Sequence, residues 1–287
     1  MVRKKICTLI LSCLTISSAN AFEIYQYLRW HHIKEKNGVT QYSEQPITNI
    51  DFFESKGLKN MNVIYPVYIL TDGKADRSKI KKIVEDAKLE PTKPICFDIE
   101  MGNGKNADDD LHVIIEALKI YRELGGKAPI GVYAVLPQRI VQTIKPLNEE
   151  QKEEYFQLNK QYESLAKYVD FLSPTLYFYS KRNKQNWATQ AALSMEEARK
   201  YAHKYDLKIY PFISLSTWDA IDKKSYITPV SEEYMTNALL ILKSQGADGV
   251  VVWESAAART AKDKQFAIFE TNKDSYKAVI DFAKKYK

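Results

Sequence analysis

Apolar positions beyond residue 60 follow two alternating patterns. Short runs rich in β-branched and aromatic residues are separated by longer stretches in which apolar residues recur every three or four positions. The short runs predict buried strands, and the longer stretches predict amphipathic helices. The expected strands span residues 63–70, 95–99, 130–136, 168–172 with 175–179 beyond Pro174, 207–215 and 247–253, and an early strand is expected near 23–30.

The helical stretches carry recognisable end signals. Ser194, with Glu197 three residues later, predicts a capping box, and Ser231 precedes two glutamates that favour a first helical turn. Gly125 and Gly126 end the stretch before them. The expected helices span residues 76–88, 108–124, 149–166, 194–205, 231–244 and 274–285.

This alternation predicts an α/β fold in which helices cover a parallel sheet. Seven strands, each but the first followed by a helix, favour a distorted (β/α) barrel over an open doubly wound sheet. The expected barrel is TIM-barrel-like, has seven or eight parallel strands, and forms a single domain over residues 22–287. No Gly-x-Gly-x-x-Gly motif follows a strand, so no dinucleotide and no other cofactor is expected.

Residues 1–21 have the pattern of a secretory signal peptide. Arg3, Lys4 and Lys5 precede an apolar core at 6–16, and a small-x-small cleavage site follows at 19–21. The apolar core is too short for a stable membrane span, and retention as an uncleaved anchor is the alternative. We therefore expect a secreted or periplasmic protein with no membrane association after cleavage.

Loss of this segment changes the charge and the cysteine content. The formal net charge falls from +6 to +3 when the three basic residues leave, and Cys96 is the one cysteine of three that remains. An exported chain with a single cysteine folds without an internal disulfide. The mild charge, with lysines scattered along helical patterns, argues against nucleic-acid binding.

Candidate chemistry first appears in the stretch KPICFDIEMGNG, residues 93–104. Asp98 and Glu100 close an apolar run, and on a strand they would share one face. Two neighbouring carboxylates resist joint ionisation, so one keeps its proton to higher pH, as the general acid of glycoside hydrolysis must. We expect Glu100, nearer the barrel mouth, to be the acid and the deeper Asp98 to orient it. The spacing alone also allows a metal site, a buried ion pair or a helix cap.

Aromatic residues dominate the other expected strand ends, where the active sites of (β/α) barrels form. Their rings stack on the apolar faces of sugars, which points to a polysaccharide partner. The histidines at 31, 32, 112 and 203 lie away from strand ends, so no metal site is expected. The strand-end candidates are Tyr68 or Thr71, Asp98 with Glu100, Tyr133 with Pro137 and Gln138, Tyr177, Tyr179, residues 214–218, and Trp253 with Glu254.

Four of these segments, in order, resemble the hyaluronidase family of glycoside hydrolases, the animal and venom type with a distorted (β/α) barrel. They are the DIE segment 98–100, GVYAVLP 131–137, PTLY 174–177 and GADGVVVW 246–253. Their family counterparts look like D-W-E, GYY-F-P, P-S-I-Y and G-A-A-G-V-V-L-W. The similarity covers roughly residues 93–262.

The resemblance implies a retaining, substrate-assisted reaction in which the N-acetyl oxygen of the substrate attacks the sugar carbon. Glu100 would be the acid and then the base, while Asp98 would hold the acetamide with help from Tyr177. Trp253 would form the floor of the sugar site, and Tyr133 would line it.

Tyr179 and Phe212 complete the expected substrate-binding residues. The chain departs from the family at Phe212, where the family has tyrosine, and at Ile99, where it has tryptophan. The family's disulfides are missing, and the first 70 residues match poorly. The expected function is a glycosidase that cleaves a polysaccharide with N-acetylated sugars. The alternatives are a catalytically silent carbohydrate-binding barrel and a lysozyme-like or chitinase-like barrel hydrolase.

Overall fold

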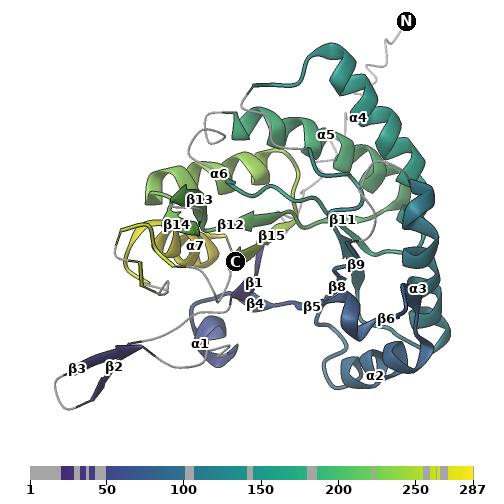
Figure 1. Ribbon diagram of the computed structural model, residues 1–287, viewed down its shortest axis with the longest axis horizontal. Helices are drawn as coiled ribbons and strands as arrows, with labels where there is room; N and C mark the ends of the chain where they lie inside the picture. Colours follow the sequence, from purple (N-terminus) through teal and green to yellow (C-terminus); the bar gives the residue numbers. More distant parts are fainter. Residues whose placement is uncertain are drawn as a thin grey trace, which may run out of the picture.

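A central ring of strands is surrounded by helices in the computed structural model (Figure 1). The structure describes residues 21–28, 33–36, 39–42, 50–100, 107–140, 145–179, 186–221, 224–254, 259–262, 264–265 and 271–286. Residues 1–20 of the expected signal peptide lie outside the described residues, so that assignment stays a prediction. Within the described ranges, no helix combines the length and the apolarity that crossing a membrane requires.

The central strands form two sheets in which every pairing is parallel. Their orders are β12-β15-β1-β4 and β11-β10-β9-β8-β5. The strands are β1 Glu23–Leu28, β4 Lys59–Asn60, β5 Asn62–Ile64, β8 Ile95–Phe97, β9 Ile130–Tyr133, β10 Phe171–Ser173, β11 Lys208–Ile209, β12 Phe212–Ser214 and β15 Gly249–Glu254.

Two bent chain segments join these sheets into a ring. β4 runs into β5 through Met61, and β11 runs into β12 through Tyr210 and Pro211. β4 pairs with β1 while β5 pairs with β8, and β11 pairs with β10 while β12 pairs with β15. Since the pairing returns to its start, the described residues close a barrel of seven parallel segments. The predicted (β/α) barrel is confirmed.

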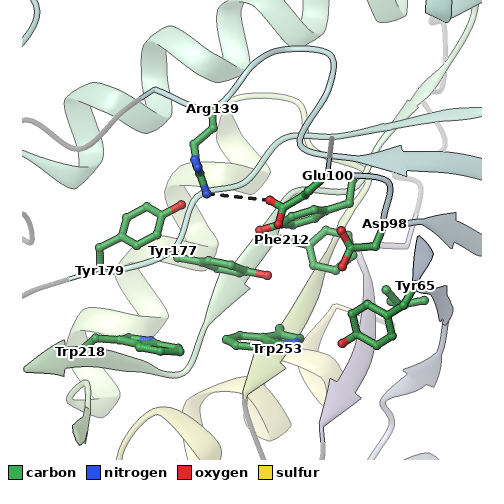
Figure 2. A pocket seen from close by; sticks show the side chains of 11 residues that line it. Tyr65, Asp98, Glu100, Arg139, Tyr177, Tyr179, Phe212, Trp218 and Trp253 are labelled. Atoms are coloured by element: carbon green, nitrogen blue, oxygen red, sulfur yellow. Dashed lines mark ion pairs between the residues drawn. The ribbon is translucent and has the colours of Figure 1, made fainter. Parts of the chain in front are cut away.

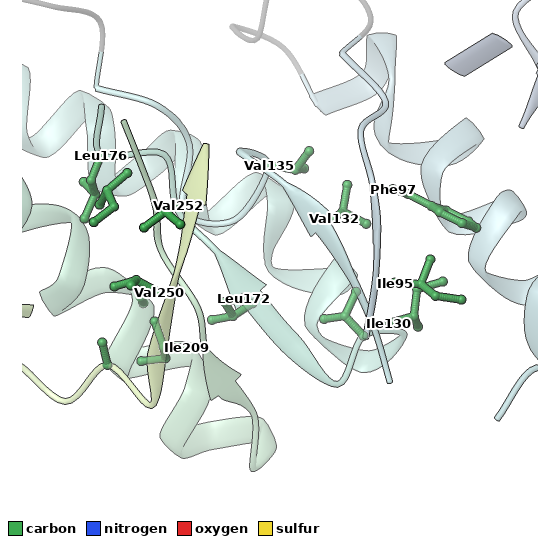
Figure 3. Close-up of a cluster of buried hydrophobic side chains, with 14 of the residues drawn as sticks. Ile95, Phe97, Ile130, Val132, Val135, Leu172, Leu176, Ile209, Val250 and Val252 are labelled. Atoms are coloured by element: carbon green, nitrogen blue, oxygen red, sulfur yellow. The ribbon is translucent and has the colours of Figure 1, made fainter. Parts of the chain in front are cut away.

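The main hydrophobic core lies between the outside of the barrel and the helices (Figure 3). Strand side chains that point outward are almost fully buried there, and each contributes on the order of 1.5–3 kcal/mol relative to exposure. Those at the centre of this layer are Ile95, Phe97, Ile130, Val132, Leu172, Val250 and Val252.

Aromatic side chains fill the barrel interior. Phe171 lies over Gly131, where a Cβ atom would stand 2.3 Å from the phenyl ring. Deeper down, the Glu23 carboxylate accepts hydrogen bonds from the hydroxyls of Tyr25 (3.0 Å) and Tyr210 (2.8 Å) and pairs with Lys59. Burial acts to raise the pKa of Glu23, but these partners outweigh it and lower the pKa. The amino-terminal end of the barrel is therefore plugged.

The helices around the barrel largely match their predicted positions. The Asp76 carboxylate accepts from the amides of Ser78 and Lys79 at the start of one helix, and Ser231 caps another. One boundary was wrong: α5 begins at Trp187, and Ser194 is buried inside it rather than capping it. The helices are α1 Ile50–Ser55, α2 Arg77–Ala87, α3 Leu111–Glu123, α4 Glu149–Tyr162, α5 Trp187–Tyr205, α6 Glu232–Ser244 and α7 Asp274–Lys285.

Several predicted strands are shorter than expected. The 63–70 strand stops at Ile64 because Pro66 opens a 3-10 helix, Pro66–Tyr68. The 130–136 strand stops at Tyr133, since Ala134 has a left-handed φ of 57°. The 175–179 stretch makes only an isolated bridge at Thr175.

Within the described ranges, three antiparallel hairpins were not predicted. They are β2–β3 (Ile33–Lys36 and Val39–Tyr42), β6–β7 (Leu70–Thr71 and Lys74–Ala75) and β13–β14 (Ser216–Ile221 and Lys224–Pro229).

Candidate active site

A pocket of about 280 Å³ lies over the carboxyl ends of the barrel strands. The structure brings all seven predicted site residues together in its wall (Figure 2). The lining residues are Val63, Tyr65, Asp98, Glu100, Tyr133, Arg139, Tyr177, Tyr179, Phe212, Trp218 and Trp253.

The two carboxylates stand just beyond β8 rather than on it. β8 ends at Phe97, and the amide of Asp98 still donates to the carbonyl of Ile64 on the neighbouring segment (2.9 Å). The Asp98 side chain is half-buried, whereas that of Glu100 is 58% exposed. Asp98 thus lies deeper and Glu100 nearer the mouth, and both face the pocket (Figure 2).

Burial makes Asp98 the proton-holding member of the pair. Desolvation, and then the charge of Glu100, raise the pKa of Asp98 to about 7. The sequence predicted that Glu100, as the acid, would be the carboxyl that keeps its proton beside the other. The structure places this effect on the deeper residue because desolvation outweighs the mutual repulsion.

Arg139 brings a positive charge to the same wall, and sequence reasoning missed it. Its Nη1 lies 3.9 Å from Oε1 of Glu100. The preceding Gln138 is buried and anchored at both ends, because its amide donates to Asn159 Oδ1 (2.7 Å) and its side-chain Nε2 donates to the carbonyl of Val135 (2.6 Å). Arg139 could have been predicted as a pocket residue from its position directly after Pro137 and Gln138, which were already strand-end candidates.

A row of aromatic rings forms one side of the pocket. Tyr177 packs on Trp253 with ring centroids 5.3 Å apart and planes 24° apart. Trp218 lies beside Trp253 at 5.8 Å with planes only 7° apart. Tyr179 meets Tyr177 edge-on at 5.8 Å. The row offers flat apolar surface of the kind that sugar rings stack on.

Tyr133 and Phe212 form the inner end of the pocket. The Tyr133 hydroxyl and Thr175 Oγ1 are 3.0 Å apart and share a hydrogen bond. Its ring meets Phe212 edge-on at 5.0 Å. Burial raises the pKa of both Tyr133 and Tyr177, so these hydroxyls stay protonated and can donate hydrogen bonds. Phe212 brings no hydroxyl.

Other sequence candidates lie elsewhere. Tyr68 is 63% exposed and Thr71 is also exposed, and neither lines the pocket; Tyr65 takes that place. Cys96 is fully buried and burial raises its thiol pKa, as expected of a packing residue. Among the described residues, no group of three His, Cys, Asp or Glu side chains is placed to hold a metal. The histidine pair at 31 and 32 lies outside that range.

Comparison with solved structures identifies similar folds. Bee venom hyaluronidase superposes with a TM-score of 0.54 at 14% sequence identity, over 82% of this chain and 91% of that one. An endo-β-1,4-mannanase double mutant from Cellulomonas fimi superposes with a TM-score of 0.47 at 11% identity, over 82% of this chain and 56% of that one. No protein-family model and no curated protein sequence matches. The likeness to the bee enzyme establishes the barrel fold that the two chains share.

Proposed function

We propose that this chain is a retaining glycoside hydrolase that cleaves a polysaccharide containing N-acetylated sugars, in the manner of hyaluronidases. The observation that carries the proposal is the carboxylate pair Asp98 and Glu100 inside an aromatic-lined pocket at the carboxyl end of a (β/α) barrel. Barrel enzymes place their chemistry at this end. The proposal agrees with the fold shared with bee venom hyaluronidase.

The first step breaks the glycosidic bond. The Glu100 carboxyl gives its proton to the glycosidic oxygen while the acetamide oxygen of the same sugar attacks the anomeric carbon. The bonding electrons leave with the departing sugar, and a cyclic oxazolinium forms. In the second step the Glu100 carboxylate takes a proton from water, whose oxygen attacks the anomeric carbon and reopens the ring. Configuration is retained, and Glu100 ends protonated.

Asp98 and Tyr177 orient the acetamide in this scheme. An ionised Asp98 accepts a hydrogen bond from the acetamide N–H, and this bond raises the electron density on the attacking acetamide oxygen. The Tyr177 hydroxyl points toward the side of the pocket where Asp98 lies (Figure 2). Because it stays protonated, it can donate to the acetamide oxygen.

A single proton shared by Asp98 and Glu100 is enough for Glu100 to be the acid and for Asp98 to be the ionised acceptor of the acetamide. In the free pocket it resides on Asp98, because burial favours the neutral form there. Approach of the acetamide N–H favours an ionised Asp98, and transfer of the proton to Glu100 arms the acid. Activity therefore requires one proton on the pair, and kcat/KM is expected to fall as pH rises through about 7, where that proton leaves.

Reducing-end release from a panel of glycans, measured for the wild type and for Glu100→Gln, tests the proposal. The panel includes hyaluronan, chondroitin, chitin oligomers and bacterial cell-wall glycan. We expect the wild type to cleave at least one substrate with N-acetylated sugars and Glu100→Gln to lose at least 1,000-fold in kcat while still binding it. Glu85→Gln, an exposed carboxylate on α2, is the matched control. An undiminished rate for Glu100→Gln overturns the assignment of the acid.

A catalytically silent sugar-binding barrel is the second candidate, because Phe212 lacks the hydroxyl that its family counterpart carries. A silent barrel predicts glycan binding without any release of reducing ends.

A third candidate is a hydrolase that uses an enzyme nucleophile. The thiazoline derived from N-acetylglucosamine distinguishes it from the substrate-assisted enzyme. This compound mimics the oxazolinium, and strong inhibition supports acetamide participation.

We also propose that the protein is exported. The basic, apolar and small-residue pattern of residues 1–21 supports a secreted or periplasmic enzyme. Amino-terminal sequencing of the exported protein is expected to begin at residue 22.

A further inference from the structure

Trp218 reaches the pocket from outside the barrel ring. It belongs to β13 of the β13–β14 hairpin, opposite Ile227 on β14. Its amide donates to the carbonyl of Tyr179 (3.0 Å), which ties the hairpin to the segment beyond β10. The amide of Ile227 donates to the carbonyl of Arg259 (2.8 Å), which holds the other strand. The hairpin is thus fixed on both sides, and Trp218 is held in place.

The indole of Trp218 packs on its own hairpin and also faces the pocket. It packs against the buried Ile227 in a small hydrophobic cluster separate from the main core. The same side chain is only partly buried and lines the pocket. Packing on Ile227 does not by itself require an aromatic ring that faces the pocket. The pocket-facing part of the indole is therefore available to contact a ligand.

Trp218 and Trp253 together form one flat surface. Their planes differ by 7° and their centroids lie 5.8 Å apart. Figure 2 shows both indoles edge-on at the same level, with Trp253 on the side of Asp98 and Trp218 farther away. The surface therefore extends from the carboxylates toward the hairpin and is longer than the one ring that a single sugar would need.

We infer that Trp218 is the floor of a second sugar subsite, which binds the sugar unit next to the one that reacts over Trp253. The inference rests on the proposed function, since it places the reacting unit at Asp98 and Glu100. The ligand class is an oligosaccharide of two or more pyranose units, the outer of which presents its apolar face to Trp218. Stacking at this subsite contributes binding energy remote from the reacting bond, so short substrates lose it.

Two probes of different length test the subsite. The thiazoline of N-acetylglucosamine fills only the reacting position, whereas a tetrasaccharide that the wild type cleaves spans both. For Trp218→Ala we expect an unchanged inhibition constant for the thiazoline, within twofold. The dissociation constant of the tetrasaccharide, measured by calorimetry in the Glu100→Gln background, should rise about tenfold, the equivalent of about 1.4 kcal/mol.

Two further variants control the experiment. Trp218→Phe keeps a flat ring and is expected to retain most of the tetrasaccharide affinity, whereas a merely structural defect would appear as a loss of thermal stability in both variants. Tyr68→Ala removes an exposed aromatic side chain that does not line the pocket and should change neither constant.

The remaining outcomes overturn the inference in distinguishable ways. If Trp218→Ala weakens both probes equally, Trp218 supports the reacting position and is no separate subsite. If it weakens neither, the indole does not contact the glycan. If the wild type binds neither the thiazoline nor any tetrasaccharide of the panel, the proposed function fails and the subsite fails with it.

Discussion

The guanidinium of Arg139 stands 3.9 Å from the carboxylate of Glu100 at the mouth of the pocket. Both side chains are about half-exposed, at 49% and 58%, so water weakens their attraction. The positive charge of Arg139 is nevertheless expected to oppose the burial and the charge of Glu100, which together raise the pKa of Asp98.

Arg139→Gln is therefore expected to shift the alkaline limb of the kcat/KM profile to higher pH, by less than about one unit because the pair is exposed. The pH dependence of kcat/KM, measured at low ionic strength, checks this. Arg77→Gln, which breaks an exposed ion pair with Glu123 away from the pocket, serves as the control and should leave the limb in place. A shift of the alkaline limb to lower pH would contradict the role given to Arg139.

Asp98 is expected to make the folded state less stable as pH rises. Its pKa is about 7 in the folded protein against an ordinary value of 3.8, so between about pH 4 and 7 the folded state keeps a proton that the unfolded state releases. Asp98→Asn stays neutral and avoids this loss. We expect it to be more stable than the wild type at pH 8, by about 1–3 kcal/mol after allowance for partial exposure, and equal at pH 4.

Urea denaturation between pH 4 and 8 measures this difference. Asp76→Asn provides a control of opposite sign, because hydrogen bonds from Ser78, Thr71 and Lys79 lower the pKa of Asp76 in the folded protein. That variant should lose stability above pH 4. A flat difference between wild type and Asp98→Asn across the range would mean that burial does not perturb Asp98.

Phe212→Tyr is expected to raise kcat. Phe212 is buried but lines the pocket, so we expect a hydroxyl added to its ring to face the cavity. The resemblance places a tyrosine at this position, and the added hydroxyl would supply a hydrogen bond that positions the acetamide or a sugar hydroxyl for the reaction. We expect a several-fold gain in kcat on the best glycan substrate. Phe178→Tyr is the control variant, because it adds the same hydroxyl to a buried ring that does not line the pocket.

Gly131→Ala should destabilise the barrel. A methyl group there would stand 2.3 Å from the Phe171 ring, which is itself buried and packs against Tyr210 with ring centroids 5.3 Å apart. We expect a loss of about 2–3 kcal/mol in the free energy of unfolding. The double variant Gly131→Ala with Phe171→Leu should be less destabilised than the sum of the two single variants, because the smaller side chain accommodates the methyl. Strict additivity would show that the two positions do not touch.

The chain's own patterns determined the barrel and most of the pocket at its carboxyl end. Apolar runs with β-branched residues encode strands that are buried on both faces, and amphipathic stretches between them encode the covering helices. Once a parallel barrel is assumed, residues that follow strands must gather at one end. For this reason Asp98, Glu100, Tyr177 and Trp253 could be assigned to one pocket before any contact was known.

Only the tertiary structure decided how these groups interact. The proton-holding role of Asp98 depends on burial by neighbours distant in sequence, and the pairing of Arg139 with Glu100 depends on where the loop after β9 returns. Likewise, Trp218 became part of the pocket because a hairpin folds back beside Trp253. Local patterns encode the direction in which a side chain leaves its own strand, whereas desolvation and charge pairing arise from the segments that meet it in space.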